Sequence, residues 1–202
     1  MWDADRQPPA RPRAFGKRLR GVAAVEFALL AICFFTVFLG LMELARLVYV
    51  FNTLQEVTRR AAAMAINAPF TPAAQDAVRS AALFLDSTGT LMLGSPVTAA
   101  HVKIDYLSLS QEGTVLAVAP MSTLPSNAAA NRINCLANPY GANCIRFVRV
   151  RICQPDAPQD CAAVPYRMLF SLVDLTAVTL PRSVTIVPAQ TLGYVPGALP
   201  GY

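Results

Sequence analysis

Charged residues are scarce in this sequence, and one stretch has none at all. Asp, Glu, Lys and Arg make up 14% of the 202 residues, whereas soluble domains carry about 25%. No charge lies between Phe27 and Met42. A helix from Val22 to Met42 would be about 30 Å long, which matches the hydrocarbon thickness of a bilayer. The shortage of charge therefore predicts one transmembrane helix.

Signatures of catalysis and of metal binding are missing as well. The chain has a single histidine, His101, and it contains no G-x-x-x-x-G-K-[ST], G-x-S-x-G or H-E-x-x-H motif and no glycine-rich dinucleotide fingerprint. We therefore expect no enzyme activity, no cofactor and no metal. His101 lies on an apparent strand, where we expect it to face solvent.

Positive charge is concentrated at the N-terminus. The chain carries a net charge of +5, and residues 1–21 hold six basic residues against two acidic ones. A basic flank directly before an apolar segment predicts that the N-terminus is cytoplasmic. A nucleic-acid-binding arm has a similar composition. Membrane orientation explains the tail better, so we predict a membrane and no nucleic acid as a partner.

Four of the five cysteines cluster in the C-terminal half. They are Cys135, Cys144, Cys153 and Cys161. Such a cluster in an exported region favours two disulfides. Three pairings are open, and short loops favour Cys135–Cys144 with Cys153–Cys161. A zinc site is the alternative, but no C-x-x-C pair occurs and His101 is distant in sequence. Cys33 is interpreted as an apolar residue of the membrane helix.

Two helices are predicted from the pattern of the first ninety residues. Helical character extends over Val22–Ile66 until Pro69 ends it. A second helix begins with Thr71 as N-cap and Pro72 in its first turn, and Thr88-Gly89 ends it.

The remaining chain has the alternation of β-strands. Residues 101–110 and 144–153 alternate apolar and polar side chains, and three shorter β-rich pieces are Val115–Ala119, Tyr166–Val173 and Val184–Val187. We expect an α+β fold in which a small antiparallel sheet lies against the helices. Residues 123–142 are predicted to be a long polar loop, and residues 193–202 a tail that runs free or along the surface.

These elements suggest three segments. We expect a basic cytoplasmic leader at 1–21, largely disordered, a transmembrane helix at 22–50, and a periplasmic α+β domain with disulfides at 51–202. A cleaved secretory signal peptide would have an apolar core of roughly 7–15 residues ending at small residues. The core here is longer, so we prefer a membrane anchor.

One acidic residue lies just inside the apolar segment. A carboxylate at this depth is costly, so Glu26 requires a reason. Prepilins combine a basic leader ending in glycine, a glutamate as the fifth residue after the cut, and an apolar helix. In this sequence the leader would end at Gly21, Val22 would become the new N-terminus, and Glu26 would be its fifth residue.

The wider motif makes the resemblance specific. The string RGVAAVEFALL, followed by GLMELARLVYVFNTLQEVTRRAA, resembles TadE-type pseudopilins of the Tad (tight adherence, Flp) type IVc pilus system, over residues 18–66. The resemblance implies a pilin-like fold, cleavage after Gly21 by a prepilin peptidase, and assembly through Glu26 and the adjacent Phe27. Other pilins, pseudopilins and inner-membrane assembly proteins would be its partners, and pilus-based adhesion and secretion its setting.

Three questions remain open. Without cleavage the chain would be a single-pass anchor that holds a periplasmic scaffold or binding domain of a secretion machine. Glu43 and Arg46 would form an i,i+3 ion pair at the outer membrane face or contact partner helices in the assembly machine. The basic row Arg146, Arg149 and Arg151 would be a solvated strand face or a partner surface.

Overall fold

The computed structural model describes residues 20–85, 89–156, 161–170, 177–189 and 192, in two units that cover 1–39 and 40–202. Most of the predicted leader and the predicted tail at 193–202 lie outside the described residues. The predicted segment boundaries at residues 21 and 50 refer to the membrane, so they stay predictions.

The first helix is the longest element. α1 spans Arg20–Ala65, so the predicted helix over Val22–Ile66 is confirmed to within two residues. It ends where expected, because Asn67 donates its side-chain amide to the carbonyl of Ala63 (3.1 Å) and Pro69 follows.

The second helix begins as predicted and ends earlier. α2 spans Pro72–Ala82, and the hydroxyl of Thr71 accepts a bond from the backbone of Ala74. The expected end at Thr88-Gly89 is wrong, because Leu83 already has an extended backbone and a buried side chain. Burying Leu83 in the core outweighs continuing the helix.

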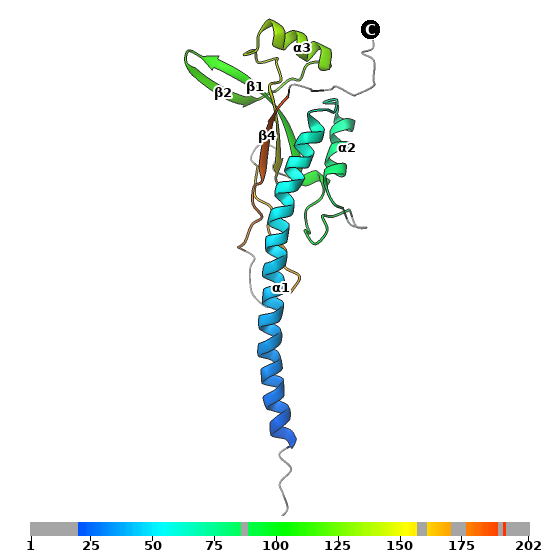
Figure 1. Ribbon diagram of the computed structural model, residues 1–202, viewed down its shortest axis with the longest axis vertical. Coiled ribbons are helices and arrows are strands. Elements are labelled where there is room, and N and C mark those ends of the chain that lie inside the picture. The colour runs from blue at the N-terminus through cyan, green and yellow to red at the C-terminus, as the bar shows by residue number, and fades with distance from the viewer. Residues whose placement is uncertain (1–19, 86–88, 157–160, 171–176, 190–191, 193–202) are drawn as a thin grey trace, which may run out of the picture. The chain divides into compact units, whose positions relative to one another are not determined.

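Four strands form one antiparallel sheet in the order β2-β1-β3-β4 (Figure 1). Their bounds are β1 Val102–Glu112, β2 Val115–Pro120, β3 Phe147–Ile152 and β4 Val184–Pro188. β1 and β3 overlap the two alternating segments, and β2 and β4 overlap two of the shorter β-rich pieces. The predicted α+β, pilin-like arrangement is confirmed, with α1 packed against this sheet.

The core lies between α1, α2 and one face of the sheet. Ile104 of β1 pairs with Val150 of β3, and both side chains are buried. The hydroxyl of Thr185 on β4 donates to that of Thr58 on α1 (2.9 Å), which ties the sheet edge to the helix. Each buried aliphatic side chain here contributes about 1.5–3 kcal/mol.

Three predictions in the C-terminal half are wrong. Residues 123–142 are not simply a loop, because α3 forms at Ala128–Ala137 with Asn127 capping Ala130. Of the predicted strand Tyr166–Val173, residues 166–170 form no strand and residues 171–173 lie outside the described residues; the neighbouring Pro165 makes an isolated bridge to Thr179. His101 does not face solvent. It closes a short 3-10 turn and is buried, and its ring nitrogen accepts a bond from the backbone N–H of Thr98 (3.0 Å).

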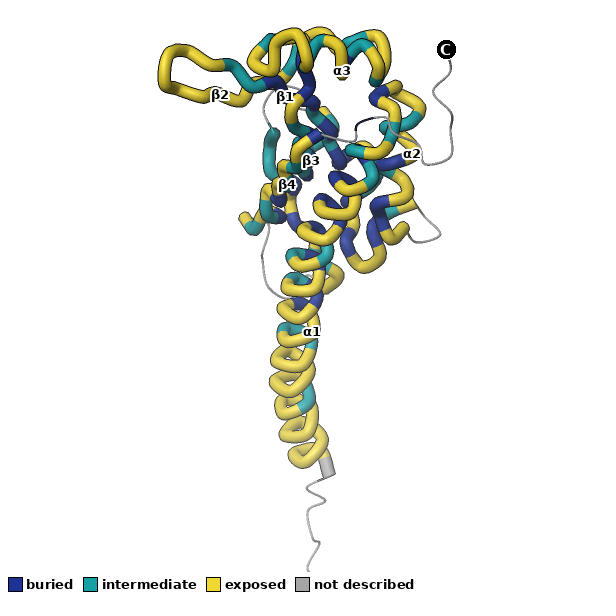
Figure 2. The backbone as a smooth tube through the Cα atoms, turned by 45° about the horizontal axis from the view of Figure 1, so that its top comes forward, coloured by how far each residue is buried: buried dark blue, intermediate teal, exposed yellow. Residues whose placement is uncertain are grey.

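The β1–β2 hairpin leaves the core. Its turn contains Gly113 at φ +61°, a conformation that glycine adopts without steric cost. All six residues of β2 are exposed, and Figure 2 shows this end of the hairpin in yellow. The hairpin therefore adds little to the core and presents one free sheet edge.

Candidate functional site

The predicted processing site lies in the first turns of α1. Gly21 has no other atom near the position of an added Cβ. Val22, Glu26 and Phe27 are all exposed. Val22 and Glu26 are one helical turn apart, so they lie on the same face about 6 Å apart along the axis.

The stretch after Phe27 has apolar side chains on every face. Nearly all are exposed, including Leu30, Phe34, Phe35 and Phe38. The hydroxyl of Thr36 donates to the carbonyl of Ile32 (2.8 Å), so this polar group is satisfied inside the helix. Length and composition make α1 the one described helix that could cross a membrane. No described residue covers this stretch, and an apolar helix exposed all round is typical of one that is buried by its surroundings, such as a membrane span.

Glu43 and Arg46 begin the buried stripe of α1. The stripe continues at helical spacing with Val50, Leu54, Val57, Ala61 and Ala65. The predicted ion pair forms, with Arg46 Nη1 lying 2.9 Å from Glu43 Oε1. The two residues are only 7% and 6% exposed, so two charges lie buried at the end of the stripe that is nearer the apolar segment.

Two segments that are distant in the sequence supply further hydrogen bonds to this ion pair. Arg46 donates to the carbonyls of Leu93 (2.7 Å) and Arg167 (2.7 Å). The carboxylate of Glu43 accepts bonds from the Tyr166 hydroxyl (2.5 Å) and from the backbone of Leu169 (3.3 Å). Buried charges need such partners. The pair therefore fastens both segments to α1, and contact with a partner helix stays a prediction.

Tyr166 is the central partner. Its ring lies under the Arg46 guanidinium at 5.0 Å from the centroid, a cation–π distance. Burial, with the bond to Glu43, raises the pKa of Tyr166 to about 12. The hydroxyl therefore stays protonated and keeps donating to Glu43 well above neutral pH.

The turn that carries Leu93 is tightly built. Leu93 has φ +56°, which is unusual for a bulky residue. A Cβ at Gly94 would come within 2.5 Å of the buried Leu91 side chain, so the turn requires glycine there. Leu91 is held from both sides, since its backbone accepts from Gly94 and donates to Val97. The turn thus anchors Leu91 in the core and leaves the neighbouring Met92 and Leu93 exposed.

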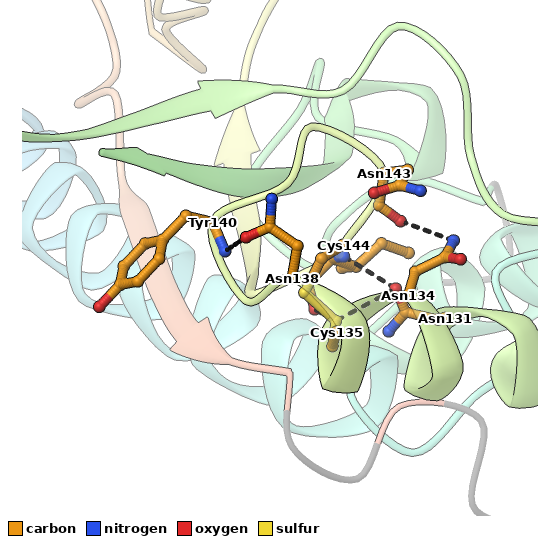
Figure 3. The surroundings of a disulfide bond; sticks show 8 residues. Asn131, Asn134, Cys135, Asn138, Tyr140, Asn143 and Cys144 are labelled. Atoms are coloured by element: carbon orange, nitrogen blue, oxygen red, sulfur yellow. Dashed lines mark hydrogen bonds between the residues drawn. A yellow bond between two sulfur atoms is a disulfide. The ribbon is translucent and has the colours of Figure 1, made fainter. Parts of the chain in front are cut away.

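Two disulfides are present, in the pairing that the short loops favour: Cys135–Cys144 and Cys153–Cys161. Figure 3 shows the first of them beside α3. The Asn131 side chain accepts the backbone N–H of Ile145 (2.8 Å) and is buried. The disulfide and this bond together attach α3 to the start of β3.

Two members of the basic row are bound within the sheet. Arg149 and Arg151 on β3 both pair with Asp105 on β1, at 3.0 and 2.8 Å, so one of their two positive charges is neutralised there. Arg146 precedes β3 and is exposed, and its role as a partner surface stays a prediction. Burial lowers the pKa of His101, which favours the neutral ring that accepts from Thr98. The Asp105 ion pairs and the His101–Thr98 bond stabilise the fold.

A surface hollow of about 410 Å³ lies between α3 and β3. It is lined by Asn131, Leu136, Ile145 and Phe147, among others, and its buried amide, on Asn131, is already bonded to Ile145. Among the residues that the structure describes, no three His, Cys, Asp or Glu side chains are grouped to hold a metal.

The fold and α1 define a pilin-like protein with a long apolar N-terminal helix. Residues 21–63 match a family model described as TadE-like protein. This segment is therefore TadE-like, and the resemblance carried by the helix motif is confirmed. No curated protein and no solved structure gives a significant match. The match implies a protein associated with the Tad pilus. TadE-like pilus proteins are structural.

The apolar helix together with the two disulfides indicates a membrane-anchored domain outside the cytoplasm. The sequence reasoning missed the partners of Glu43 and Arg46. Tyr166 and Leu93 lie 120 and 47 residues from Arg46, and no spacing rule connects them. The Asp105 pair could have been found, because Asp105 and Arg149 stand on predicted strands that neighbour each other.

Proposed function

We propose that this protein is a minor pseudopilin or pilus-assembly protein of a Tad system, processed by a prepilin peptidase after Gly21. The observation that carries the proposal is the family match, which begins at Gly21 and covers the exposed apolar helix. The N-terminus is cytoplasmic, because the basic flank precedes the span, and the disulfide-linked domain lies in the periplasm.

The processing site suits an intramembrane peptidase. Such an enzyme must bring its catalytic groups to the peptide bond between Gly21 and Val22. Gly21 offers no side chain and no packed neighbour in the way. Hydrolysis leaves the leader with a carboxylate at Gly21 and the mature chain with an α-amine at Val22.

Assembly then depends on Glu26. The new amine of Val22 and the carboxylate of Glu26 carry opposite charges at the end of an apolar helix, where screening is weak. The amine of one subunit pairs with Glu26 of its neighbour and sets the axial register between helices. Phe27, exposed beside Glu26, adds apolar contact area at the same level. Other pilins, pseudopilins and inner-membrane assembly proteins are the partners.

The test is the mature N-terminus. N-terminal sequencing of protein extracted from membranes of the native host should begin at Val22. Gly21→Phe should leave the leader attached, increase the mass accordingly and reduce piliation. Gly40→Phe is the matched control, since Gly40 also has open space around its Cβ position and lies far from the cut.

Glu26→Ala separates processing from assembly. The variant should still be cut after Gly21, yet it should lose assembly, and Glu26→Asp should restore part of it. A mature chain that starts at Met1, with normal piliation in both variants, would instead identify a permanently anchored scaffold of a secretion machine.

A further inference from the structure

Two apolar tips flank α1 at the membrane end of its buried stripe. One is Met92–Leu93 and the other is Leu169–Phe170. Their side chains are 51%, 55%, 60% and 40% exposed, which is unusual for large apolar residues that lie together at one level of a domain. We propose that these two apolar tips insert into the headgroup region of the bilayer and dock the domain on the membrane surface.

Hydrogen bonds fix both tips at the same level of the helix. The carbonyl of Leu93 accepts from Arg46, and the backbone of Leu169 donates to Glu43. Figure 1 shows the orange segment that contains Leu169 running beside α1. The two tips come from different parts of the chain, yet the same ion pair holds them, so they move together with α1.

The position of the two apolar tips along the axis of α1 agrees with the dimensions of a bilayer. The uncharged segment ends at Met42, and Arg46 is four residues further, about 6 Å along the axis. The polar layer on each side of the hydrocarbon is about 5–7 Å thick. If the hydrocarbon boundary lies at Met42, both tips lie within that layer, where partly apolar side chains are stable.

Charge also fits a lipid surface. Residues 89–98 and 164–170 contain one charged residue, Arg167, and no acidic one. Arg167 is exposed between Tyr166 and Leu169, so its guanidinium is placed to meet lipid phosphates while the neighbouring apolar side chains enter the interface.

The backbone of Leu93 adds an independent observation. It is the one described non-glycine residue with positive φ, and a bulky residue there is unfavourable. In water the exposed side chain of Leu93 would gain no burial to offset this cost. At the membrane surface the same side chain leaves water, which offsets the cost of its backbone conformation.

The occupant is lipid rather than protein because the tips continue an apolar surface that already requires a bilayer. Leu41, Met42 and Leu44 of α1 are exposed just before and beside the ion pair. Lipid that covers these residues reaches the tips without a break. A protein partner would have to fit the same narrow space around the helix.

Tryptophan fluorescence in vesicles tests the docking. The chain has one tryptophan, Trp2, so the full-length Trp2→Phe variant is the background. Phe170→Trp and Met92→Trp then report one tip each in phosphatidylglycerol/phosphatidylethanolamine vesicles. With lipids brominated in the upper acyl chain we expect blue-shifted emission and a marked loss of intensity relative to unbrominated vesicles.

Two further reporters make the result decisive. Leu136→Trp, at a residue of α3 that is 86% exposed, should emit as in water and keep its intensity. Phe34→Trp, inside the apolar segment, should be quenched by bromine deeper in the chain. If Phe34→Trp is quenched while the two tip reporters behave as Leu136→Trp does, the docking proposal is wrong and the membrane anchor stands.

Blue-shifted emission from the tip reporters without quenching by the brominated lipids would mean that protein covers the tips, and it would also overturn the proposal. An unquenched Phe34→Trp would overturn the anchor itself.

Discussion

The two ends of α1 share one backbone conformation and have opposite surroundings. Residues 21–38, in one unit, expose nearly every side chain, and large ones such as Phe27 and Leu30 point outward on all faces. Residues 50–65, in the other unit, bury a stripe that includes Leu54 and Ala61 and expose charged residues such as Arg59.

The difference shows where each end obtains its stability. The C-terminal end is covered by the sheet of its own chain, and small alanines there allow close packing. No described residue covers the N-terminal end, and lipid and other helices can cover it. Glu43 and Arg46 mark the change, because they are the first buried residues of the stripe and also the first charges after the apolar segment. Substitutions at and on either side of this boundary should therefore have sharply different effects.

The largest effect is expected at the boundary itself. Arg46→Ala leaves the carboxylate of Glu43 buried without its cation, and breaking a buried pair in this way costs about 3–5 kcal/mol. The free energy of unfolding of the full chain in detergent measures it. Arg59→Ala, at an exposed position of the same helix, should change that energy by no more than about 0.5 kcal/mol.

A double variant separates charge from packing. Glu43→Gln with Arg46→Met removes both charges and keeps most of the volume, so part of the lost stability should return. Equal losses for Arg46→Ala and Arg59→Ala would show that the pair is not buried in the folded protein.

One substitution made at both ends of α1 tests the comparison directly. Leu54→Ala removes a fully buried side chain and should destabilise the domain by about 2–5 kcal/mol. Leu30→Ala removes an equal side chain that is exposed among the described residues, so in detergent it should cost less than about 0.5 kcal/mol. Circular dichroism in the tyrosine region, recorded during unfolding, reports the domain in both cases. A large loss for Leu30→Ala would mean that the chain itself covers this end.

Strong local signals made much of the fold predictable. The uncharged run and the helical character that extends to Pro69 predicted α1. Thr71 and Pro72 predicted the start of α2. Alternation predicted β1 and β3, and β-rich composition predicted β2 and β4. The i,i+3 spacing on one helix predicted the Glu43–Arg46 ion pair. These features depend on residues that are close in sequence, where periodicity and capping operate.

Features that depend on distant partners were missed. The polar character of residues 123–142 predicts a loop, yet the Asn127 cap, the Asn131–Ile145 bond and the disulfide to Cys144 stabilise α3 there. Tertiary contacts can override weak propensity in this way. The segments that bind Glu43 and Arg46 could not be found from the sequence, since neither carries a motif and only the fold brings them to α1.

Tyr166→Phe should have a moderate effect. It removes the hydroxyl that donates to Glu43 and should cost about 1–3 kcal/mol, because a buried acceptor loses a partner. The pKa of Tyr166 is raised above its unfolded value of about 10 to about 12. The native chain thus holds its proton longer than the unfolded chain, so this contribution is complete below pH 10 and is lost as the pH rises through 12.

The free energy of unfolding measured across pH 9–12 checks whether stability falls as the pH rises. The wild-type chain should lose stability in this window, and Tyr166→Phe should lose less. Tyr106 also has a pKa raised to about 12 by burial, so Tyr106→Phe should flatten the curve similarly without affecting the ion pair. An identical slope in all three proteins would contradict the assignment.

The smallest effect is expected at Leu93, and its sign depends on the surroundings. Asparagine tolerates positive φ better than leucine, so Leu93→Asn should stabilise the chain in detergent by up to about 1 kcal/mol. Leu169→Asn makes the same chemical change at a residue without positive φ and should give no gain. In vesicles the gain at Leu93 should shrink or reverse, because there the leucine side chain has an apolar environment to lose. A detergent result in which both variants destabilise equally would mean that Leu93 is not held in the left-handed conformation.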